Sequence, residues 1–337
     1  MRYALAILAI MSCALAPVMP AHAISSSAAI LLTLPANARS IAMGDIGAAD
    51  NSDPSTIFYN PANVCSATRV YGLVSQQRFE IDDNIWARRA NAGFSGSSPE
   101  SPWMVGLDFG YARLRYGQTV IVDTGGNPTD TLDTYEDVAS VTMGLGFHAG
   151  HVLDMRFGGA VKMWRARFDQ QYQATSFDAG VAITLRERYG AWNITPSLGA
   201  ALIDAGEDIR YPDQSTDNLP TRLNAGASLC IESSPCNVLS ARVPLVAVTV
   251  QTEAINPLHD AVEWGIGNEI AIAQMLFVRS GVRRYAADNT STNAPTYASW
   301  GVGAGIPAGG LRMRFDYGRQ TNSGDRDHMD VLVEWKF

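Results

Sequence analysis

The chain has 337 residues, of which 47% are hydrophobic and 17% are charged, and its formal net charge is −8. This length suffices for one large β domain or two small ones. The negative charge argues against a nucleic-acid partner, because such partners are held mainly through their phosphates by basic side chains.

The first 23 residues have the pattern of a cleaved secretory signal peptide. Arg2 supplies the positive start, residues 3–15 form a short apolar run, and Ala21-His22-Ala23 supplies the small residues that signal peptidase requires. The apolar run is too short to cross a bilayer as a helix, which needs roughly 20 residues. A lipoprotein box at residues 10–13 is the alternative interpretation. We expect a mature chain that begins near Ile24.

Residues 24–66, which we name the hatch, follow the signal peptide. They do not alternate between apolar and polar residues, and they are rich in small residues, turn formers and aspartate. This composition predicts a compact, irregular segment rather than a strand. The hatch residues of interest are Arg39, Met43, Gly44, Asp45, Asp53, Asn60, Pro61 and Ala62.

From residue 67 to residue 337, segment after segment alternates. In the last one, Met329, Val331, Val333, Trp335 and Phe337 alternate with mostly charged residues. Because strand side chains point to opposite faces in turn, one face of such a strand is apolar. Elsewhere the second face is largely Gly, Ala and scattered charge. This pattern favours an all-β fold, a transmembrane antiparallel β-barrel whose apolar face is turned to lipid.

About 14 strands are predicted for this barrel. They are placed at 69–80, 87–97, 102–115, 136–149, 152–167, 173–187, 192–204, 219–231, 237–252, 261–273, 275–286, 296–306, 310–320 and 328–337. In an outer-membrane barrel, connections after odd-numbered strands are extracellular and long, and the others are short turns. The long polar connections fit this rule and lie at 116–135, 205–218, 287–295 and 321–327.

Charged residues are expected to line the lumen of the barrel, where the hatch folds back as a plug. The lumen charges that we predict are Arg156, Arg312, Arg314 and Asp316. Charges inside a barrel need partners or water. The hatch acids Asp45, Asp50 and Asp53 either pair with these arginines and anchor the hatch, or face periplasmic water.

The hatch sequence resembles that of a known family. Ala38-Arg39, Met43-Gly44 and Asn60-Pro61-Ala62 stand in the order found in PorV/PorQ-type outer-membrane proteins. These belong with the FadL-type transporters of long-chain fatty acids and other hydrophobic compounds. Asn63-Val64 replace the usual Gly-Leu. The resemblance covers residues 26–64, and it implies a fourteen-stranded barrel with an N-terminal hatch in the bacterial outer membrane.

Several side chains have two interpretations each. Phe58 and Tyr59 line a pocket for an apolar ligand, or pack the hatch against the barrel wall. Asn60 holds the shape of the hatch, since Pro61 biases it toward extended geometry, or it contacts ligand. Trp335 and Phe337 are ordinary strand residues, or the terminal aromatic signal that the barrel assembly machinery recognises.

The cysteines and glycines are the last residues to which the sequence suggests a role. Cys230 and Cys236 bracket a segment that reads as a turn, which a disulfide could staple in the periplasm, or they are two free thiols. No Cys/His cluster suggests zinc, and no Gly-x-Ser-x-Gly elbow suggests an enzyme, so we expect no metal, no cofactor and no catalytic residues. The Gly-x-Gly patterns lie inside strands and are expected to relieve crowding on the lumen face, at Gly144, Gly146, Gly265, Gly267, Gly301 and Gly303.

Three functions remain open, and the resemblance implies the first two. The first is a transport barrel that moves hydrophobic, fatty-acid-like molecules past the hatch. The second is an accessory protein of type IX secretion, whose barrel or loops bind secreted cargo or partner proteins. The third is a structural or adhesion protein without a ligand. All three share lipid, lipopolysaccharide and the barrel assembly machinery as expected partners.

Overall fold

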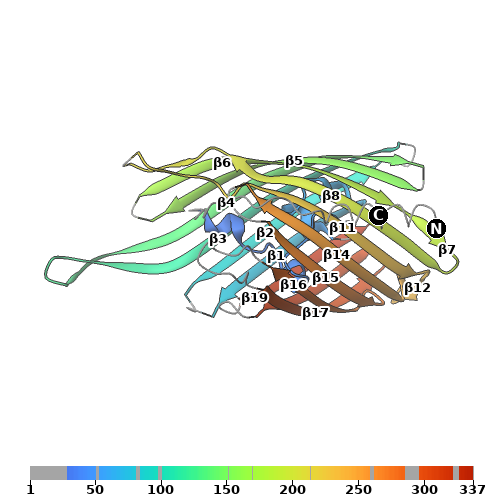
Figure 1. Ribbon diagram of the computed structural model, residues 1–337. Helices are drawn as coiled ribbons and strands as arrows, with labels where there is room; N and C mark the ends of the chain where they lie inside the picture. The colour runs from blue at the N-terminus through green and yellow to red at the C-terminus, as the bar shows by residue number, and fades with distance from the viewer. Residues whose placement is uncertain are drawn as a thin grey trace.

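The structure, a computed structural model, shows a closed barrel of fourteen antiparallel strands (Figure 1). The described residues are 29–50, 53–80, 84–97, 101–150, 152–168, 170–212, 214–258, 262–284, 296–321 and 326–336. The predicted signal peptide and Phe337 lie outside them. The last wall strand pairs with the first along its whole length, from Lys336 opposite Arg69 to Arg326 opposite Phe79, and this pairing closes the barrel.

Each predicted strand overlaps one strand of the wall. The wall strands are β1 (Arg69–Phe79), β2 (Trp86–Ser97), β3 (Trp103–Val122), β4 (Pro128–Ala149), β5 (Leu153–Arg167), β6 (Gln171–Leu185), β8 (Trp192–Gly206), β11 (Arg222–Ser233), β14 (Val246–Pro257), β15 (Glu263–Ile272), β16 (Leu276–Arg284), β17 (Thr296–Ala308), β18 (Leu311–Gln320) and β19 (Arg326–Lys336). The predicted fold class is confirmed.

Alternation along each strand sorts side chains between the outside and the lumen. On β19, Met329, Val331 and Trp335 are 46%, 45% and 58% exposed, whereas the intervening Asp330 and Glu334 are buried. A soluble protein has the opposite arrangement, with apolar side chains inside. A continuous outer belt of exposed apolar side chains is stable when lipid covers it, and a closed barrel leaves no unpaired strand edge there.

The two ends of the barrel differ in their connections. At one end lie tight turns after β4, β15 and β17, and two of them use glycines with positive φ, Gly150 (67°) and Gly309 (60°). At the other end the β3–β4 hairpin projects far beyond the rest of the wall (Figure 1). Since each tight turn follows an even-numbered wall strand, the turn end is the periplasmic end.

The structure corrects two of the predicted assignments, one of a connection and one of the start of a strand. Residues 116–135, predicted as a loop, mostly continue β3 and β4, because the Thr- and Val-rich sequence favours extended backbone. Residues 237–245, predicted as the start of a wall strand, instead belong to a small hairpin of β12 (Pro235–Val238) and β13 (Ala241–Pro244). Its turn residues Leu239 and Ser240 both have positive φ.

The remaining elements are short. β7 (Glu187–Tyr189) pairs with β8 at the periplasmic end, and β9 (Ile209–Arg210) with β10 (Thr216–Asp217) forms a hairpin in the extracellular connection between β8 and β11. The hatch contains α2 (Ile30–Thr33), α3 (Ala38–Ala42) and the 3₁₀ helices η1 (Pro54–Phe58) and η2 (Pro61–Cys65). No helix among the described residues is long and apolar enough to cross a membrane.

Candidate functional site

The hatch owes its short helices to asparagine and aspartate caps. The side chain of Asn37 accepts a hydrogen bond from the Ser40 N–H and begins α3, and Asp53 and Asn60 do the same for η1 and η2. Such residues are preferred N-caps because they satisfy a helix N–H that has no backbone partner. Proline follows the cap in η1 and η2, where its missing N–H costs nothing. The local sequence therefore sets the shape of the hatch.

Glycines of the wall let the hatch backbone lie directly on the lumen face. A Cβ atom added at Gly158 or Gly199 would lie less than 3.0 Å from the backbone of Pro61 or Ala48. On the other side of the lumen, a Cβ atom added at Gly267 would likewise lie less than 3.0 Å from the backbone of Met43. Glycine permits such a close approach because it has no side chain. The expectation that Gly-x-Gly patterns relieve crowding is confirmed at Gly267.

Buried ion pairs fasten the hatch to the lumen face of the wall. Asp53 contacts Arg314 of β18 at 2.5 Å. This is the first of the two alternatives for the hatch acids, in which they pair with arginines of the lumen. Asp45 pairs with Arg283 of β16, which the sequence did not single out. A buried pair that loses one partner leaves an uncompensated charge, so these contacts hold the hatch in one position.

Arg39 is the central cation of this network. It pairs with Asp50 inside the hatch and donates to Glu269 of β15 at 2.9 Å and 3.1 Å. Arg39 is 2% exposed. On β14, Glu253 accepts hydrogen bonds of 2.7 Å from the N–H groups of Gly47 and Ala48.

The motif residues of the hatch hold its shape. The Asn60 amide donates to the carbonyl oxygens of Ala48 (2.8 Å) and Val181 of β6 (2.9 Å). Asn63, which replaces the usual glycine, donates to the Gly47 carbonyl oxygen and the Thr56 hydroxyl, both at 3.2 Å. These contacts agree with a structural role for Asn60.

Four further motif residues are buried in contact with the wall, Met43 and Gly44 on one side of the lumen and Pro61 and Ala62 on the other. Gly44 has a φ of +84°, and an added Cβ would lie 2.9 Å from the carbonyl oxygen of Val282. Any other residue at this position would therefore be strained and crowded. Its N–H donates to the Ser299 hydroxyl at 3.1 Å.

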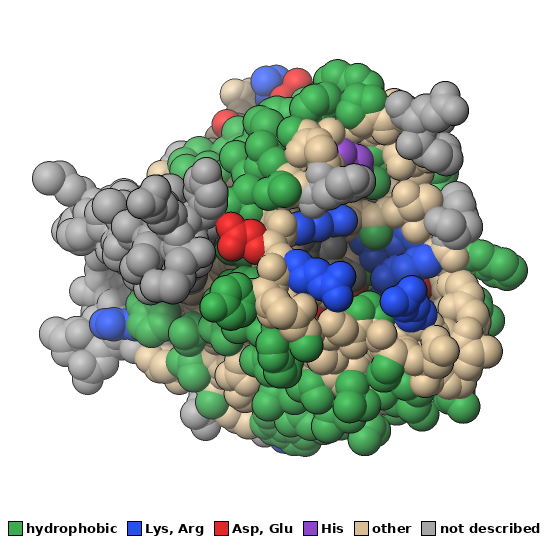
Figure 2. Space-filling view, turned by 90° about the vertical axis from the view of Figure 1, so that its right-hand side faces the viewer, with side chains coloured by type: hydrophobic (Ala, Val, Ile, Leu, Met, Phe, Trp, Pro, Cys, Tyr) green, Lys and Arg blue, Asp and Glu red, His purple; other side chains and the backbone are tan. Residues whose placement is uncertain are grey.

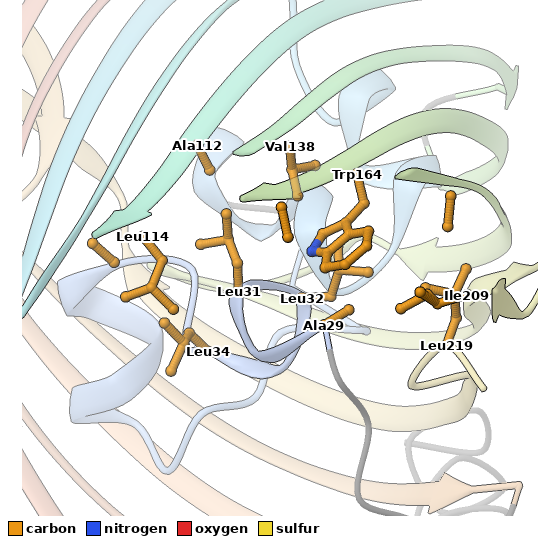
Figure 3. Close-up of a cluster of buried hydrophobic side chains, with 13 residues drawn as sticks. Ala29, Leu31, Leu32, Leu34, Ala112, Leu114, Val138, Trp164, Ile209 and Leu219 are labelled. Atoms are coloured by element: carbon orange, nitrogen blue, oxygen red, sulfur yellow. The ribbon is translucent and has the colours of Figure 1, made fainter. Parts of the chain in front are cut away.

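An apolar cluster fills the lumen toward the extracellular end (Figure 3). We call it the apolar lumen cluster. Leu31 and Leu32 project into it from α2, and Trp164 of β5 faces them, as Figure 3 shows. Its buried members are Ala29, Leu31, Leu32, Leu34, Ala87, Ala112, Leu114, Val138, Trp164, Ala166, Ala174, Ile209 and Leu219. Glu136 anchors α2 there, accepting from the Leu31 N–H (3.0 Å) and the Trp164 indole (2.9 Å).

A cavity adjoins this cluster, between the hatch and the wall. Its volume is about 30 Å³, so side chains nearly fill it. Phe58 and Tyr59 both line it, together with Leu32 and Leu34. The Tyr59 hydroxyl donates to Asp45 at 2.5 Å, and the Arg89 guanidinium lies 5.4 Å from the Phe58 ring centre. The structure therefore brings the two predicted aromatic residues to one cavity.

A second, wider hollow opens at the periplasmic end, and we call it the vestibule. Its volume is about 840 Å³. Figure 2, which views the barrel from this end, shows Lys and Arg side chains gathered around the hollow and hydrophobic side chains on the outside. The basic residues of its rim include Arg186, Arg188, Arg242, Arg312 and Lys336.

The predicted lumen charges all lie on the inner face. Arg156 is buried and donates to Thr184 at 3.0 Å. Arg312 pairs with Glu334 at 2.6 Å, and Asp316 pairs with Arg314 at 2.5 Å. Asp316 also accepts from Arg279 of β16 at 2.7 Å. Trp335 is exposed on the outer face near the end of β19, and Phe337 lies outside the described residues.

Cys230 and Cys236 are free thiols, which is the second of the two interpretations of this pair. The segment between them is not a turn, because β11 continues to Ser233 and β12 begins at Pro235. Strand residues rise about 3.3 Å each, whereas a disulfide needs Cα atoms within about 7 Å. Cys65, the last residue of η2 in the hatch, is a buried free thiol.

Sequence reasoning missed several wall residues that hold the hatch. Arg283, Glu269, Glu253 and Glu136 were not singled out, although each occupies the face of its strand opposite the apolar residues. Charged residues on the non-apolar face of strands were the signal that could have found them. Their partners could not have been chosen, since these depend on how the hatch is turned inside the barrel.

No family model matches the sequence, and no curated protein matches it. Solved structures do resemble it. A TodX monoaromatic hydrocarbon channel, as a deltaS2 mutant, has a TM-score of 0.50 and 10% identity, with 89% of this chain and 97% of that chain covered. A Pseudomonas aeruginosa FadL homologue has a TM-score of 0.49 and 10% identity, with 89% of this chain and 98% of that chain covered. The CymD monoaromatic hydrocarbon channel has a TM-score of 0.48 and 11% identity, with 90% of this chain and 97% of that chain covered.

At such low identity the likeness concerns the fold. The chain has the fold of the FadL-type outer-membrane channels, a closed fourteen-stranded barrel with an apolar outer belt. A closed barrel with an apolar outer belt is the architecture of a protein of the bacterial outer membrane, as the sequence predicted.

Proposed function

We propose that the protein conducts small hydrophobic molecules across the outer membrane, past the hatch. The observation that carries this proposal is the apolar lumen cluster with the cavity beside it. Barrels that conduct water-soluble molecules have polar lumens. Here Leu32, Leu34 and Phe58 offer apolar surface inside the barrel, where a hydrophobic molecule can leave water. The TodX channel, which shares the fold, is described as a channel for monoaromatic hydrocarbons.

A fatty-acid-like substrate, which would have to displace side chains to enter this cavity, is supported by a cation beside it. Arg89 lines it and donates to the carbonyl oxygens of Leu31 (2.8 Å) and Leu34 (3.3 Å). Within the described part of the chain, no carboxylate lies within 4 Å of Arg89, so its charge is not balanced by an ion pair. A carboxylate at the end of an apolar chain would balance this charge.

Uptake measurements with two matched variants test the proposal. Leu34→Gln places an amide in the cavity wall, whereas Ile30→Gln makes the same change on the exposed side of α2, outside the apolar lumen cluster. Radiolabelled toluene and decanoate are offered to cells of a host without such a channel. Leu34→Gln should slow uptake about tenfold, as expected when a site loses one buried apolar contact of about 1.5–3 kcal/mol.

Ile30→Gln should leave uptake unchanged. Equal effects of both variants would mean that the cavity does not bind the substrate. If the wild-type protein gave no more uptake than an empty vector for either compound, the transport function would be wrong.

A second function, accessory to type IX secretion, is favoured by the β3–β4 hairpin. This hairpin projects beyond the wall, and Val120 and Ile121 near its tip are exposed. Exposed apolar residues beyond the lipid are typical of protein-binding surfaces. Deleting residues 118–133 should then abolish co-purification of a secreted cargo or a secretion-system protein and leave uptake intact. Loss of uptake without loss of a protein partner would exclude this function.

We also propose that Trp335 and Phe337 serve as the assembly signal for the barrel assembly machinery, and that lipid and lipopolysaccharide surround the apolar belt. Replacing Trp335 with alanine should lower the amount of barrel in the outer membrane. The barrels that do insert should keep wild-type thermal stability, because Trp335 faces outward and does not contribute to the lumen.

A further inference from the structure

At the rim of the vestibule, basic charge is concentrated around one carboxylate. Glu334 of β19 is fully buried, and it is the ion-pair partner of Arg69 of β1 (3.2 Å), Arg312 of β18 (2.6 Å) and Lys336 of β19 (3.4 Å). The three cations come from neighbouring strands at the periplasmic end. Arg312 and Lys336 therefore share a carboxylate whose single charge cannot balance both of them.

The two cations on the cavity side have no second carboxylate. Within the described ranges, neither Arg312 nor Lys336 has a carboxylate other than Glu334 within 4 Å. Arg312 also donates to the Gln274 side chain at 2.8 Å, but its buried Nε has no hydrogen-bond partner there. Unmet donors of a buried guanidinium are costly, and an oxyanion is the group that satisfies them best.

Arg312 and Lys336 are also close enough to share one ligand. Both contact the same oxygen of Glu334, Oε1, and both line the vestibule. Lys336 is 47% exposed, so its ammonium group is free to turn toward the hollow. A carboxylate or phosphate group with two oxygens can accept from both side chains at once.

Besides Glu334, the vestibule is lined by Glu187 and Glu232, fewer acids than the five basic side chains of its rim, and the acids toward the hatch are already engaged. Asp53 pairs with Arg314, and Glu269 is held by Arg39 and Arg279. Deeper in the barrel, basic and acidic groups therefore compensate one another, whereas at the rim the basic groups are in excess. The excess faces the periplasm (Figure 2).

We propose that Arg312 and Lys336 form an oxyanion-binding site at the periplasmic rim, which takes the carboxylate or phosphate group of a small molecule. The site is separate from the cavity near Phe58, which lies on the other side of the hatch. It does not depend on the transport of hydrophobic molecules. Failure of uptake in the Leu34→Gln experiment would leave it untouched.

Equilibrium dialysis of the purified full-length protein against radiolabelled inorganic phosphate, at low ionic strength, tests the site. Wild-type protein should bind saturably. Lys336→Gln should weaken the affinity about tenfold, since it removes one charge-assisted hydrogen bond, and Lys336→Arg should retain it. Lys336 is half exposed, so neither change should prevent folding.

Arg188→Gln is the matched control. Arg188 lies on the same rim, and its side chain donates to the Gly190 carbonyl oxygen at 3.4 Å. The variant removes the same charge from the rim without touching the site, and phosphate affinity should change less than about twofold, because exposed charges are screened. If Lys336→Gln and Arg188→Gln lowered the phosphate affinity equally, phosphate would be attracted by the overall positive charge of the rim and not by a specific site. The absence of saturable phosphate binding would also overturn the proposal.

Two further probes identify the source of the oxyanion. Octanoate and acetate carry the same carboxylate with and without an apolar chain. Tighter binding of octanoate would assign the site to the acidic end of an amphiphile, and equal binding would assign it to free small anions. Both outcomes support an oxyanion site, provided that Lys336→Gln weakens them.

Discussion

Gly158→Ala is the sharpest perturbation of the seating of the hatch. Gly158 faces the lumen from β5, and its added Cβ would lie less than 3.0 Å from backbone atoms of Pro61 and Ala62. The backbone of β5 lies on one side of this contact and the backbone of the hatch on the other, so no flexible side chain can move aside to relieve the clash. The hatch must shift.

The magnitude follows from the cost of inserting a methyl group into a packed region, about 1–3 kcal/mol. Because about 1.4 kcal/mol corresponds to a factor of ten in an equilibrium, the variant should raise the population of a displaced hatch about tenfold or more.

Cys65 reports on this displacement. Cys65 belongs to the hatch and is 1% exposed, and its sulfur faces Gly144 of the wall. In a background with Cys230→Ser and Cys236→Ser, Cys65 is the only cysteine after residue 23. The rate at which a maleimide labels it in the folded barrel should rise about tenfold or more in Gly158→Ala.

Gly159→Ala is the control, one residue further along the same strand. Its Cβ points to the outside and would lie 3.5 Å from the Asp178 carbonyl oxygen, an ordinary contact. Labelling should stay at the background rate. If both variants labelled Cys65 equally fast, or if Gly158→Ala had no effect, the reasoning that glycines seat the hatch would be refuted.

Two further predictions concern charge and thiols. Asp53→Asn should destabilise the protein by about 3–5 kcal/mol, as expected when a buried ion pair loses one partner, and lower its thermal unfolding temperature. Asp133→Asn breaks the exposed pair with Arg115 and should change stability by less than about 1 kcal/mol. Equal shifts would contradict the anchoring role of Asp53. Because Cys230 and Cys236 are free, electrophoretic mobility should not depend on reductant, and Cys236, which is exposed, should react with a thiol reagent in the folded protein. If reductant changed the mobility, the two cysteines would form a disulfide after all.

The wall of the barrel could be predicted from the sequence because its signal is local. Alternation of apolar and other residues is a property of each strand alone, and lipid outside the barrel demands apolar residues on one face. The pattern Met329-x-Val331-x-Val333-x-Trp335 therefore placed β19 and its outer face. Alternation does not tell a wall strand from an extension of one, which is why the β3–β4 hairpin and the β12–β13 hairpin were assigned wrongly.

The site could be predicted only in part because its contacts join distant parts of the chain. The acids Asp45 and Asp53 were found, but only Asp53 meets one of the arginines that were named. Asp45 meets Arg283, more than two hundred residues away. Which wall arginine faces which hatch acid depends on the rotation of the hatch inside the closed barrel, and no local pattern records that rotation.

Native mass spectrometry of the protein, gently extracted from its own outer membrane, tests the central claim most directly. We expect a small hydrophobic molecule bound to the barrel, and this adduct should be lost in Leu34→Gln and kept in Ile30→Gln. A stoichiometric protein partner without any small adduct would contradict transport and favour the secretion-accessory function.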